Sequence, residues 1–337
     1  MPIFPADDLH LELAAQRLRD GELVAFPTET VYGLGANALD ENAVAKIYAA
    51  KGRPSFNPLI VHVADQTAAQ GLVSGWNERA EALAKAFWPG PLTLVLLKKD
   101  FIPDIVSAGL NTVAIRVPAQ PIARELLKKA GIPLAAPSAN TSGEVSPTLA
   151  SHVIESLGER CWVLDGGPCE VGIESTVVDV SSDHVSILRP GIISASQIEA
   201  LVGPLTPHNR QDGEQSQNGP LPSPGMLLRH YAPRAKVHIF PNLTDAHFHA
   251  VLLGSERKIG VIAFAPTRLE GAAETILAQE PASYAKQLYS LLRDLDARGV
   301  DLILIEEVPQ TAEWLAVRDR LNRASEASAS PALESKS

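Results

Sequence analysis

Two short segments place side chains that can bind anions at the ends of predicted strands and helices. Residues 27–35, PTETVYGLG, hold hydroxyls, a carboxylate and two glycines directly after an apolar run. Residues 51–59, KGRPSFNPL, set Lys51 and Arg53 two positions apart at a predicted helix end, with Asn57 close behind. An ammonium is a point charge and a guanidinium a planar fork, so the pair favours a phosphate or carboxylate ligand. The alternatives are threonines that cap turn backbone and, for a single cation, stabilisation of the helix dipole.

A second group of polar residues follows further predicted strands. Ser138, Asn140 and Ser146 lie near the predicted start of a helix, where free backbone N–H groups form an anion cradle. An ordinary N-cap at Ser146 explains the same residue types, and both roles can hold together. EST at residues 174–176 and RPG at residues 189–191 add more hydroxyls and a cation.

One arginine and one histidine lie inside predicted strands. Arg116 interrupts an apolar strand, and a charge there needs either an acidic side chain or a ligand carboxylate or phosphate. His62 alternates with Val61 and Val63, so it should face the other side of its strand, where a lone histidine is more typical of a structural residue. The sequence has no GxxxxGK[ST], HExxH or GxSxG motif and no Cys/His ligand cluster. Cations and hydroxyls without a nucleophile favour charge stabilisation of a phosphate-bearing substrate over covalent catalysis.

These segments need strands and helices that position them. Hydrophobic periodicity predicts helices over residues 8–20, 41–51, 78–88, 121–130 and 149–157, and strands over residues 23–26, 59–63, 92–97, 112–117, 134–136, 162–164, 176–180 and 185–188. The elements interleave, but the late strands follow one another closely. The pattern therefore predicts an α/β or α+β domain over residues 1–202, built on a twisted mixed sheet with helices, rather than a purely doubly wound fold.

The composition changes after residue 202. Residues 203–235 contain six prolines and a polar run, which predicts a linker. Its second half holds SPGM at 223–226 and RHYAP at 229–233, and a mere spacer does not need these charged and aromatic residues. We expect this linker to act as a lid over the active site.

A second, smaller domain is predicted over residues 236–325. Strands and helices alternate there as in a small Rossmann-like α/β unit, without GxGxxG. The predicted strands are 236–240, 258–264 and 300–305, and the predicted helices are 282–295 and 312–323. Residues 326–337 are expected to form a disordered tail.

The overall composition excludes several classes of protein. With 337 residues and 45% hydrophobic residues, the chain is long enough for two folded domains. Its formal net charge is −10, and that of the first 200 residues is −8, which argues against binding nucleic acid through a broad basic face. Aromatic residues make up only 5%, so base-stacking platforms are not expected either. A phosphate ligand must therefore be bound by a few local cations.

Cysteine usage and the apolar segments indicate a cytoplasmic protein. Cys161 and Cys169 stand eight residues apart and form no CxxC pair, so we expect two reduced structural thiols. Residues 1–12 carry three acidic residues and no apolar core, unlike a signal peptide. The longest apolar run, residues 92–97, is too short to cross a bilayer.

Taken together, the motifs resemble those of the L-threonylcarbamoyladenylate synthases, which have a YrdC-like catalytic domain. The resemblance covers about the first 200 residues, and SPGM and RHYAP followed by a Rossmann-like domain resemble the longer, two-domain form. The matching motifs are PTETVYGLG at 27–35, KGRPSFNPL at 51–59, PSAN at 137–140, SPT at 146–148, EST at 174–176 and RPG at 189–191.

The resemblance implies a nucleotidyltransferase that converts L-threonine, bicarbonate or CO2, and ATP into threonylcarbamoyl-AMP and pyrophosphate. Mg²⁺ would enter mainly on the ATP phosphates, with no dedicated protein metal site. The product would feed a downstream tRNA threonylcarbamoyl transferase system that modifies the adenosine beside the anticodon. We expect weak or no direct binding of tRNA and no membrane partner. The chain could also form a homodimer.

The resemblance also implies roles for individual residues. Lys51 and Arg53 would stabilise the developing phosphate charge. The residues implied to bind threonine are Thr30, His62, Arg116, Ala136 and Thr176. Those implied to bind ATP are Lys51, Arg53, Asn57, Thr112, Ser138, Asn140, Ser146, Arg189 and Tyr231, the last of which would close over the nucleotide from the linker.

Two other functions have to be weighed against this one. A YrdC-like domain can act as an RNA-binding or ribosome-associated module, but the negative charge of the first 200 residues opposes that. Carbamoyl-transfer maturation factors share the domain but carry Cys-rich zinc segments, which two cysteines cannot supply.

Overall fold

The computed structural model describes residues 3–207, 231–243, 258–267, 269 and 271–326. Contacts divide the chain into two compact units. The first holds the described residues up to 207 apart from Gly143–Val145, and the second holds Gly143–Val145 and the described residues from 231 onward. Most of the predicted linker and of the predicted tail therefore lies outside the described residues.

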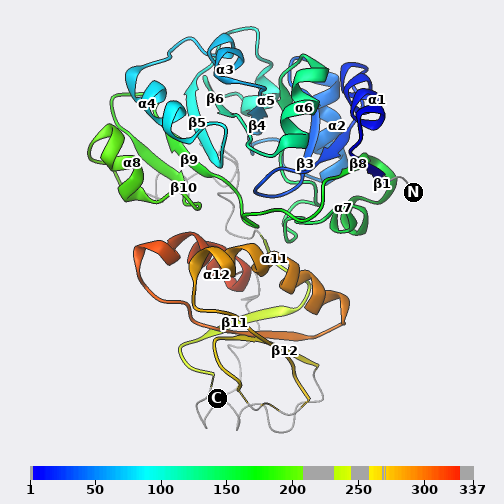
Figure 1. Cartoon of the computed structure of the whole chain (residues 1–337), viewed down its shortest axis with the longest axis vertical. Coiled ribbons are helices and arrows are strands. Elements are labelled where there is room, and N and C mark those ends of the chain that lie inside the picture. The colour runs from blue at the N-terminus through cyan, green and yellow to red at the C-terminus, as the bar shows by residue number, and fades with distance from the viewer. Residues whose placement is uncertain (1–2, 208–230, 244–257, 268, 270, 327–337) are drawn as a thin grey trace, which may run out of the picture. The chain divides into compact units, whose positions relative to one another are not determined.

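The first unit is built on one ten-stranded mixed sheet with strand order β1-β8-β2-β3-β7-β4-β6-β5-β9-β10 (Figure 1). Four of the pairings, β1 with β8, β2 with β8, β4 with β6 and β5 with β9, are parallel, and the others are antiparallel. The strands are β1 (Ile3–Pro5), β2 (Val24–Phe26), β3 (Gly33–Asn37), β4 (Ile60–His62), β5 (Leu92–Leu97), β6 (Thr112–Arg116), β7 (Leu134–Ala135), β8 (Trp162–Asp165), β9 (Thr176–Asp179) and β10 (Ser186–Arg189).

Helices cover both faces of this sheet. On one face α1 and α6 pack together over Val24, Phe26 and Leu134, while the larger core cluster on the other face contains residues from α2, α3, α4, α7 and α8. The helices of the first unit are α1 (Asp8–Arg19), α2 (Glu41–Lys51), α3 (Gln66–Leu72), α4 (Glu78–Phe87), α5 (Asp104–Ser107), α6 (Pro121–Ala130), α7 (Ala150–Leu157), η1 (Gly158–Arg160) and α8 (Ala195–Val202).

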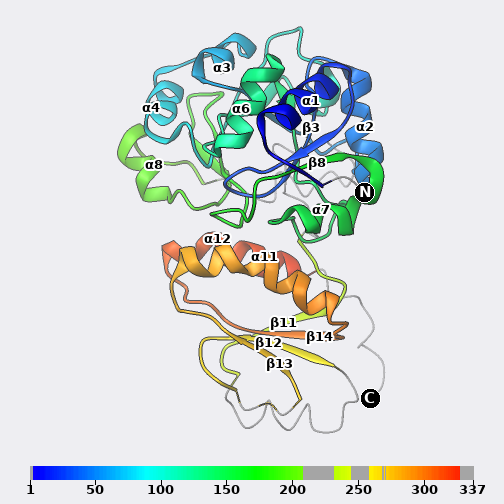
Figure 2. The same ribbon diagram turned by 45° about the vertical axis from the view of Figure 1, so that its right-hand side comes forward.

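The second unit has a four-stranded sheet of order β11-β14-β12-β13, in which every pairing is parallel. Its elements are β11 (Lys236–Phe240), β12 (Ile259–Ala263), β13 (Ala273–Ile276), α11 (Pro281–Ala297), β14 (Leu302–Glu306), η2 (Ala312–Trp314) and α12 (Leu315–Glu326). Figures 1 and 2 agree that α11 and α12 lie on the same side of the sheet. The expected mixed sheet and small Rossmann-like unit are confirmed. However, α12 ends at Glu326, one residue inside the segment expected to be tail.

Several elements of the structure were not predicted. Strand β3 has the sequence GLGAN and no apolar run, and it forms by antiparallel pairing with β2. A side chain at Gly35 would have its Cβ 2.8 Å from the ring of Phe26, so glycine lets the two strands approach. The remaining unpredicted elements are short or border loops: β1, α3, α5, η1, α8 and β13.

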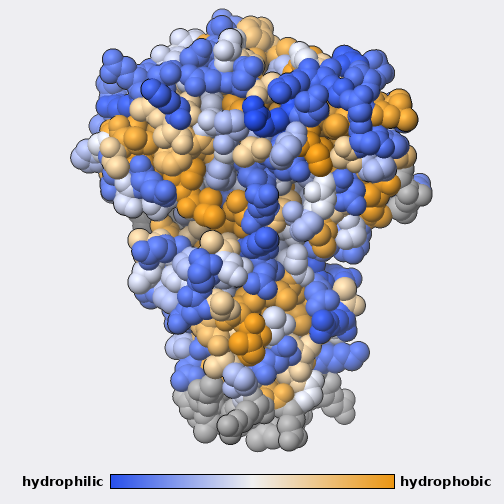
Figure 3. Space-filling view, viewed as in Figure 1, coloured by the Kyte–Doolittle hydropathy of each residue, from blue (hydrophilic) through white to orange (hydrophobic). Residues whose placement is uncertain are grey.

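The surface of the described residues mixes hydrophilic and hydrophobic side chains, as Figure 3 shows for one face. The exposed large hydrophobic residues are spread over many elements, including Leu9, Phe101, Leu201 and Leu315. No helix within the described ranges is long and apolar enough to span a membrane.

Candidate active site

Strand register puts two of the predicted site residues side by side. His62 pairs with Arg116 between the parallel strands β4 and β6, and with Leu134 between β4 and β7. Partners in register share a face of a sheet, so His62 and Arg116 lie on the face that α1 and α6 cover. Val61 and Val63 belong to the core cluster on the other face, which confirms the orientation expected for His62.

Arg116 is a buried cation held by three partners. Its Nε donates to the carbonyl of Gly90 at 3.2 Å and its Nη1 to the hydroxyl of Thr30 at 2.8 Å. Its Nη2 lies 2.7 Å from Oε1 of Glu29, and the side chains of this ion pair are only 4% and 6% exposed. The sequence left open whether an acidic side chain or a ligand balances Arg116. Glu29 supplies the acidic side chain, and a ligand remains compatible with it.

The protonation states around Arg116 follow from burial and charge. Burial raises the pKa of Glu29, but the charge of Arg116, its hydrogen bonding and nearby backbone N–H groups together outweigh burial, so the pKa lies below its usual value and the carboxylate is ionised. Burial and the charge of Arg116 lower the pKa of His62 to about 3, so the imidazole is neutral at neutral pH. Among the described residues, Nδ1 of His62 has no hydrogen-bond partner.

The buried His62 should make the folding stability depend on pH. Its pKa is about 3 in the folded chain and about 6.5 in an unfolded chain, so below pH 6.5 the unfolded state binds a proton that the folded state does not. The free energy of unfolding should therefore fall by about 1.4 kcal/mol per pH unit below pH 6.5. Urea unfolding should be measured at about pH 7.5 and about pH 5. The drop in the free energy of unfolding between these pH values should be about 2 kcal/mol smaller for His62→Gln than for the wild type. An equal drop in the free energy of unfolding for the two proteins would contradict the low pKa of His62.

Lys51 is the last residue of α2 and fastens a neighbouring loop. Asp40 caps the start of this helix, and Gly52 ends it with φ 59°. The Lys51 ammonium donates to the carbonyl of Ser138 at 2.5 Å and to that of Asn140. The side chain is buried, so this predicted catalytic cation also holds the backbone of the loop that follows β7.

Arg53 closes the next turn in a similar way. Its Nε and Nη2 donate to the carbonyls of Asn57 and Pro58, at 3.1 and 2.7 Å. The Asn57 side chain is 0% exposed, and neither Oδ1 nor Nδ2 has a hydrogen-bond partner within the described ranges. A buried amide with both ends unpaired is costly, which marks this position as one where a ligand or a water would be stabilised.

Backbone hydrogen bonds join the predicted loops to one another. Tyr32 N donates to the carbonyl of Pro147, and Ala139 N donates to that of Tyr32, each at 2.8 Å. Ser142 N donates to the carbonyl of Lys51, also at 2.8 Å. The loops with residues 27–35, 51–59 and 137–148 therefore converge, although they are far apart in sequence.

The EST and RPG segments form a further connected group. The hydroxyl of Ser146 donates to Glu174 at 2.6 Å. Arg189 donates from Nε to the Ser175 carbonyl and from Nη2 to the Ser175 hydroxyl, both at 3.1 Å. The hydroxyl of Thr176 donates to the carbonyl of Ile193 and accepts from its N–H, at 3.1 Å each. This hydroxyl is on the opposite face of the sheet from Arg116, because Thr176 pairs with the core residue Leu92.

Gly191 should be sensitive to substitution because its Cα lies against the strand that carries Thr176. A Cβ there would lie 2.6 Å from Oγ1 of Thr176 and closer still to its backbone nitrogen. We expect Gly191→Ala to lower the free energy of unfolding by about 2 kcal/mol through overpacking. Gly71→Ala within α3 is the matched control, because a Cβ at Gly71 would meet nothing within 4 Å. The free energy of unfolding of this variant should stay the same or rise slightly. Urea unfolding of both variants checks this, and equal stabilities would contradict it.

The other three predicted residues lie in different places. Ala136 follows β7, and its N–H donates to the carbonyl of Ile60 next to the Arg116 cluster. Thr112 starts β6 and so lies at the opposite end of that strand from Arg116. Tyr231 belongs to the second unit, where it is buried and its ring stacks 5.7 Å from that of Tyr289, with the Arg320 guanidinium 5.3 Å from the ring centre.

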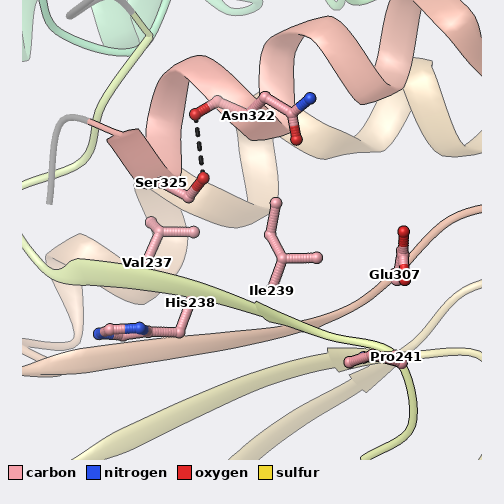
Figure 4. A pocket seen from close by; sticks show the side chains of 7 residues that line it. All are labelled: Val237, His238, Ile239, Pro241, Glu307, Asn322 and Ser325. Atoms are coloured by element: carbon pink, nitrogen blue, oxygen red, sulfur yellow. Dashed lines mark hydrogen bonds between the residues drawn. The ribbon is translucent and has the colours of Figure 1, made fainter. Parts of the chain in front are cut away.

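A separate pocket of about 460 Å³ lies in the second unit between β11 and the end of α12 (Figure 4). Val237 and Ile239 point from β11 toward the helix, and Glu307 lies near the far end of the strand. None of the residues that line the pocket is a predicted site residue. The candidate site therefore does not coincide with this pocket.

Comparison with known proteins agrees with these motifs. The Sua5/YciO/YrdC family model, described as "Telomere recombination", matches residues 16–191, and a model described as "Threonylcarbamoyl-AMP synthase, C-terminal domain" matches residues 193–326. The chain is 43% identical to the threonylcarbamoyl-AMP synthase of Pyrococcus abyssi, with 95% of each chain covered. It is 44% identical to that of Bacillus subtilis, with 94% of this chain and 93% of the relative covered. The chain belongs to the threonylcarbamoyl-AMP synthase family.

Two solved structures support the same fold. The crystal structure of P. abyssi Sua5 complexed with L-threonine superposes with a TM-score of 0.88 at 42% identity and covers 96% of each chain. The structure of E. coli YciO, at 23% identity and a TM-score of 0.52, covers 58% of this chain and shares the fold. The protein is therefore an enzyme, a nucleotidyltransferase that transfers an AMP moiety.

Sequence reasoning did not assign several residues that support the site of this threonylcarbamoyl-AMP synthase family member. Glu29 balances Arg116, and the hydroxyl of Thr93 lies 2.8 Å from that of Ser175. A carboxylate directly after a buried strand was a usable signal for Glu29, because a buried strand arginine requires an acidic partner or ligand. Thr93 gave no signal, because one hydroxyl in an apolar strand is common.

Proposed function

We propose that the enzyme makes threonylcarbamoyl-AMP and pyrophosphate from L-threonine, ATP and CO2 derived from bicarbonate. The names of the relatives and the threonine complex of P. abyssi Sua5 support this proposal. The observation that carries it is the Arg116 cluster, in which a buried, immobilised guanidinium lies beside the hydroxyl of Thr30 and the neutral imidazole of His62. Such a cation favours a small carboxylate ligand.

In this proposal threonine binds with its carboxylate on Arg116. The guanidinium presents a planar, charged pair of donors, and burial strengthens such a contact. Thr30 and His62 adjoin Arg116 directly, and Ala136 is hydrogen-bonded to the strand that carries His62. Thr176 would contact threonine through its backbone, because its hydroxyl is already hydrogen-bonded to the backbone of Ile193.

ATP would bind over the loops that Lys51 and Arg53 hold together. The unpaired, buried amide of Asn57 supports a nucleotide contact there. Lys51 would act twice, by its charge and by fixing the backbone of the loop after β7. The further ATP contacts proposed are Thr112, Ser138, Asn140, Ser146, Arg189 and Tyr231.

The chemistry then needs positioned charge rather than a covalent intermediate. The amine of threonine adds to CO2 and releases one proton, which gives a carbamate. A carbamate oxygen forms a bond to the α-phosphorus of ATP, and the bond from that phosphorus to the bridging oxygen breaks, so that pyrophosphate leaves. The cations Lys51 and Arg53 would stabilise the negative charge that develops on the phosphate oxygens.

Mg²⁺ fits this site as an ion carried by ATP. Among the residues that the structure describes, no group of three or more His, Cys, Asp and Glu side chains is arranged so that it could hold a metal ion. The carboxylate of Glu174, bonded to Ser146, is the acidic group beside the proposed nucleotide loops. When bound, Mg²⁺ would neutralise phosphate charge.

The product, a mixed carbamic-phosphoric anhydride, would be consumed by a tRNA threonylcarbamoyl transferase system that modifies the adenosine next to the anticodon. We propose a cytoplasmic enzyme with little direct affinity for tRNA. The acidic charge of the first 200 residues supports the second point. The two buried, free thiols, whose pKa burial raises to about 12, are consistent with a reducing compartment.

A pyrophosphate-release assay tests the proposal. Release should require ATP, L-threonine and bicarbonate together, and omission of any one should reduce it to background. Unchanged release without threonine would contradict the proposed reaction. A gel shift that shows tight, salt-sensitive tRNA binding without ATP would instead favour an RNA-binding role.

A further inference from the structure

The ion pair of Arg116 and Glu29 contains a group that the proposed reaction leaves without a role. Glu29 lies on the loop directly after β2, and its Oε1 is 2.7 Å from Nη2 of Arg116. Its Oε2 accepts a hydrogen bond from the N–H of Gln120 at 3.4 Å, and its own carbonyl accepts from Val171 N at 2.8 Å. Both carboxylate oxygens therefore have a partner, the backbone of Glu29 is also held, and the residue is nearly inaccessible to water.

Glu29 leaves Arg116 able to bind a second carboxylate. Each terminal nitrogen of a guanidinium carries two hydrogens. Thr30 accepts one from Nη1, whereas Nη2 and Oε1 of Glu29 form an ion pair at 2.7 Å with no hydrogen bond between them among the described residues. The remaining hydrogens on the two nitrogens can meet a ligand carboxylate, so the ligand and Glu29 can be bound at the same time.

The charges of this cluster favour a ligand with both signs of charge. Arg116 and Glu29 cancel, and His62 is neutral, so the buried cluster has no net charge. A simple carboxylate would bury one uncompensated negative charge, which is costly, whereas an α-amino acid is a zwitterion and adds none. In such a ligand the ammonium is only one carbon away from the carboxylate.

The acceptors that an ammonium would need are present in the same cluster. Oε1 of Glu29 lies next to the donor edge of Arg116, and Nδ1 of His62, beside Arg116 in register, has no partner among the described residues. A carboxylate and a neutral imidazole both accept hydrogen bonds from an ammonium, and the bond to the carboxylate is charge-assisted.

We propose that Glu29 is a specificity-determining residue that accepts the α-ammonium of the amino acid whose carboxylate Arg116 binds, and that excludes carboxylates without an amino group. The inference rests on the proposed function, since it takes threonine as the substrate. It assigns substrate selection to the pair rather than to Arg116 alone.

Calorimetric titration of the full chain tests this with two ligands that differ only in the amino group. L-Threonine and 3-hydroxybutyrate are titrated with ATP present and bicarbonate left out. The wild type should bind threonine and show no measurable binding of 3-hydroxybutyrate. In Glu29→Gln, threonine should bind about tenfold or more weakly, and 3-hydroxybutyrate should bind within about tenfold of threonine. General damage to the fold would weaken both ligands and could not produce this opposite change.

Two further variants keep the test decisive. Glu306→Gln removes a carboxylate charge in the second unit, where Glu306 accepts from Phe264 N, and should bind both ligands as the wild type does. Glu29→Asp keeps the charge if Glu29→Gln fails to fold, and should still reject 3-hydroxybutyrate. An unchanged preference in Glu29→Gln, or binding of 3-hydroxybutyrate by Glu29→Asp, would overturn this proposal alone. If the wild type does not bind threonine, both the proposed function and this inference are overturned.

Discussion

Arg116→Met should raise the threonine concentration needed for half-maximal pyrophosphate release by about 100-fold or more, because removing one partner of a buried charged contact is costly. ATP affinity should change little, because Arg116 contacts Gly90, Thr30 and Glu29 and none of the loops proposed to hold the nucleotide. Pyrophosphate release over a range of threonine concentrations measures the first effect, and an ATP titration measures the second. A normal threonine dependence would contradict the carboxylate assignment.

The double variant Arg116→Met/Glu29→Gln is the control for folding. Arg116→Met alone leaves Glu29 buried without its counter-charge, which should cost about 3–5 kcal/mol of stability. The double variant removes that charge and should recover much of the stability without recovering threonine binding. Recovery of both would mean that Arg116 acts only on the fold.

Lys51→Met should destabilise the first unit by about 3 kcal/mol and lower the rate of pyrophosphate release about tenfold or more. The ammonium donates to two backbone carbonyls, of Ser138 and Asn140, and methionine would remove both of these buried hydrogen bonds. The rate should fall because the loop that carries Ser138 and Asn140 would lose its anchor. Urea unfolding and the pyrophosphate assay measure the two effects.

Lys46→Met is a matched control on the same helix. Lys46 is exposed and donates to a single carbonyl, that of Gly21, at 2.7 Å. Its replacement should cost about 1 kcal/mol or less and leave the rate of pyrophosphate release unchanged. A Lys51→Met protein as stable as Lys46→Met would show that the two carbonyls find other donors.

Some elements could be predicted because their signals are local. Helix α6 spans Pro121–Ala130, as predicted, since Pro121 suits the first turn and Gly131 ends the helix with φ 66°. Strand β3 could not be predicted, because its stability comes from its neighbours β2 and β7 and not from its own glycine-rich sequence.

The sequence pointed to candidate site residues, but it could not reveal the contacts that these residues make. The motifs named Arg116, Thr30 and His62, and strand alternation gave the face of His62. The sequence could not say that Arg116 bonds to Glu29 and Gly90, because these contacts join residues separated by many positions. It also could not reveal that Lys51 points to backbone carbonyls, since a buried and an extended lysine give the same sequence pattern.

The strand order of the large sheet bears on how the chain can fold while it is being synthesised. Strand β8 lies between β1 and β2 and pairs in parallel with both, so the first two strands of the chain have no common neighbour until residue 165 has been made. The loops with Ser175 and Arg189 come later still. Until then the nascent chain exposes unpaired strand edges, which are prone to association with other chains. Contacts this distant in sequence also slow folding. The enzyme thus depends on late-synthesised residues both to protect its first strands and to complete the proposed active site.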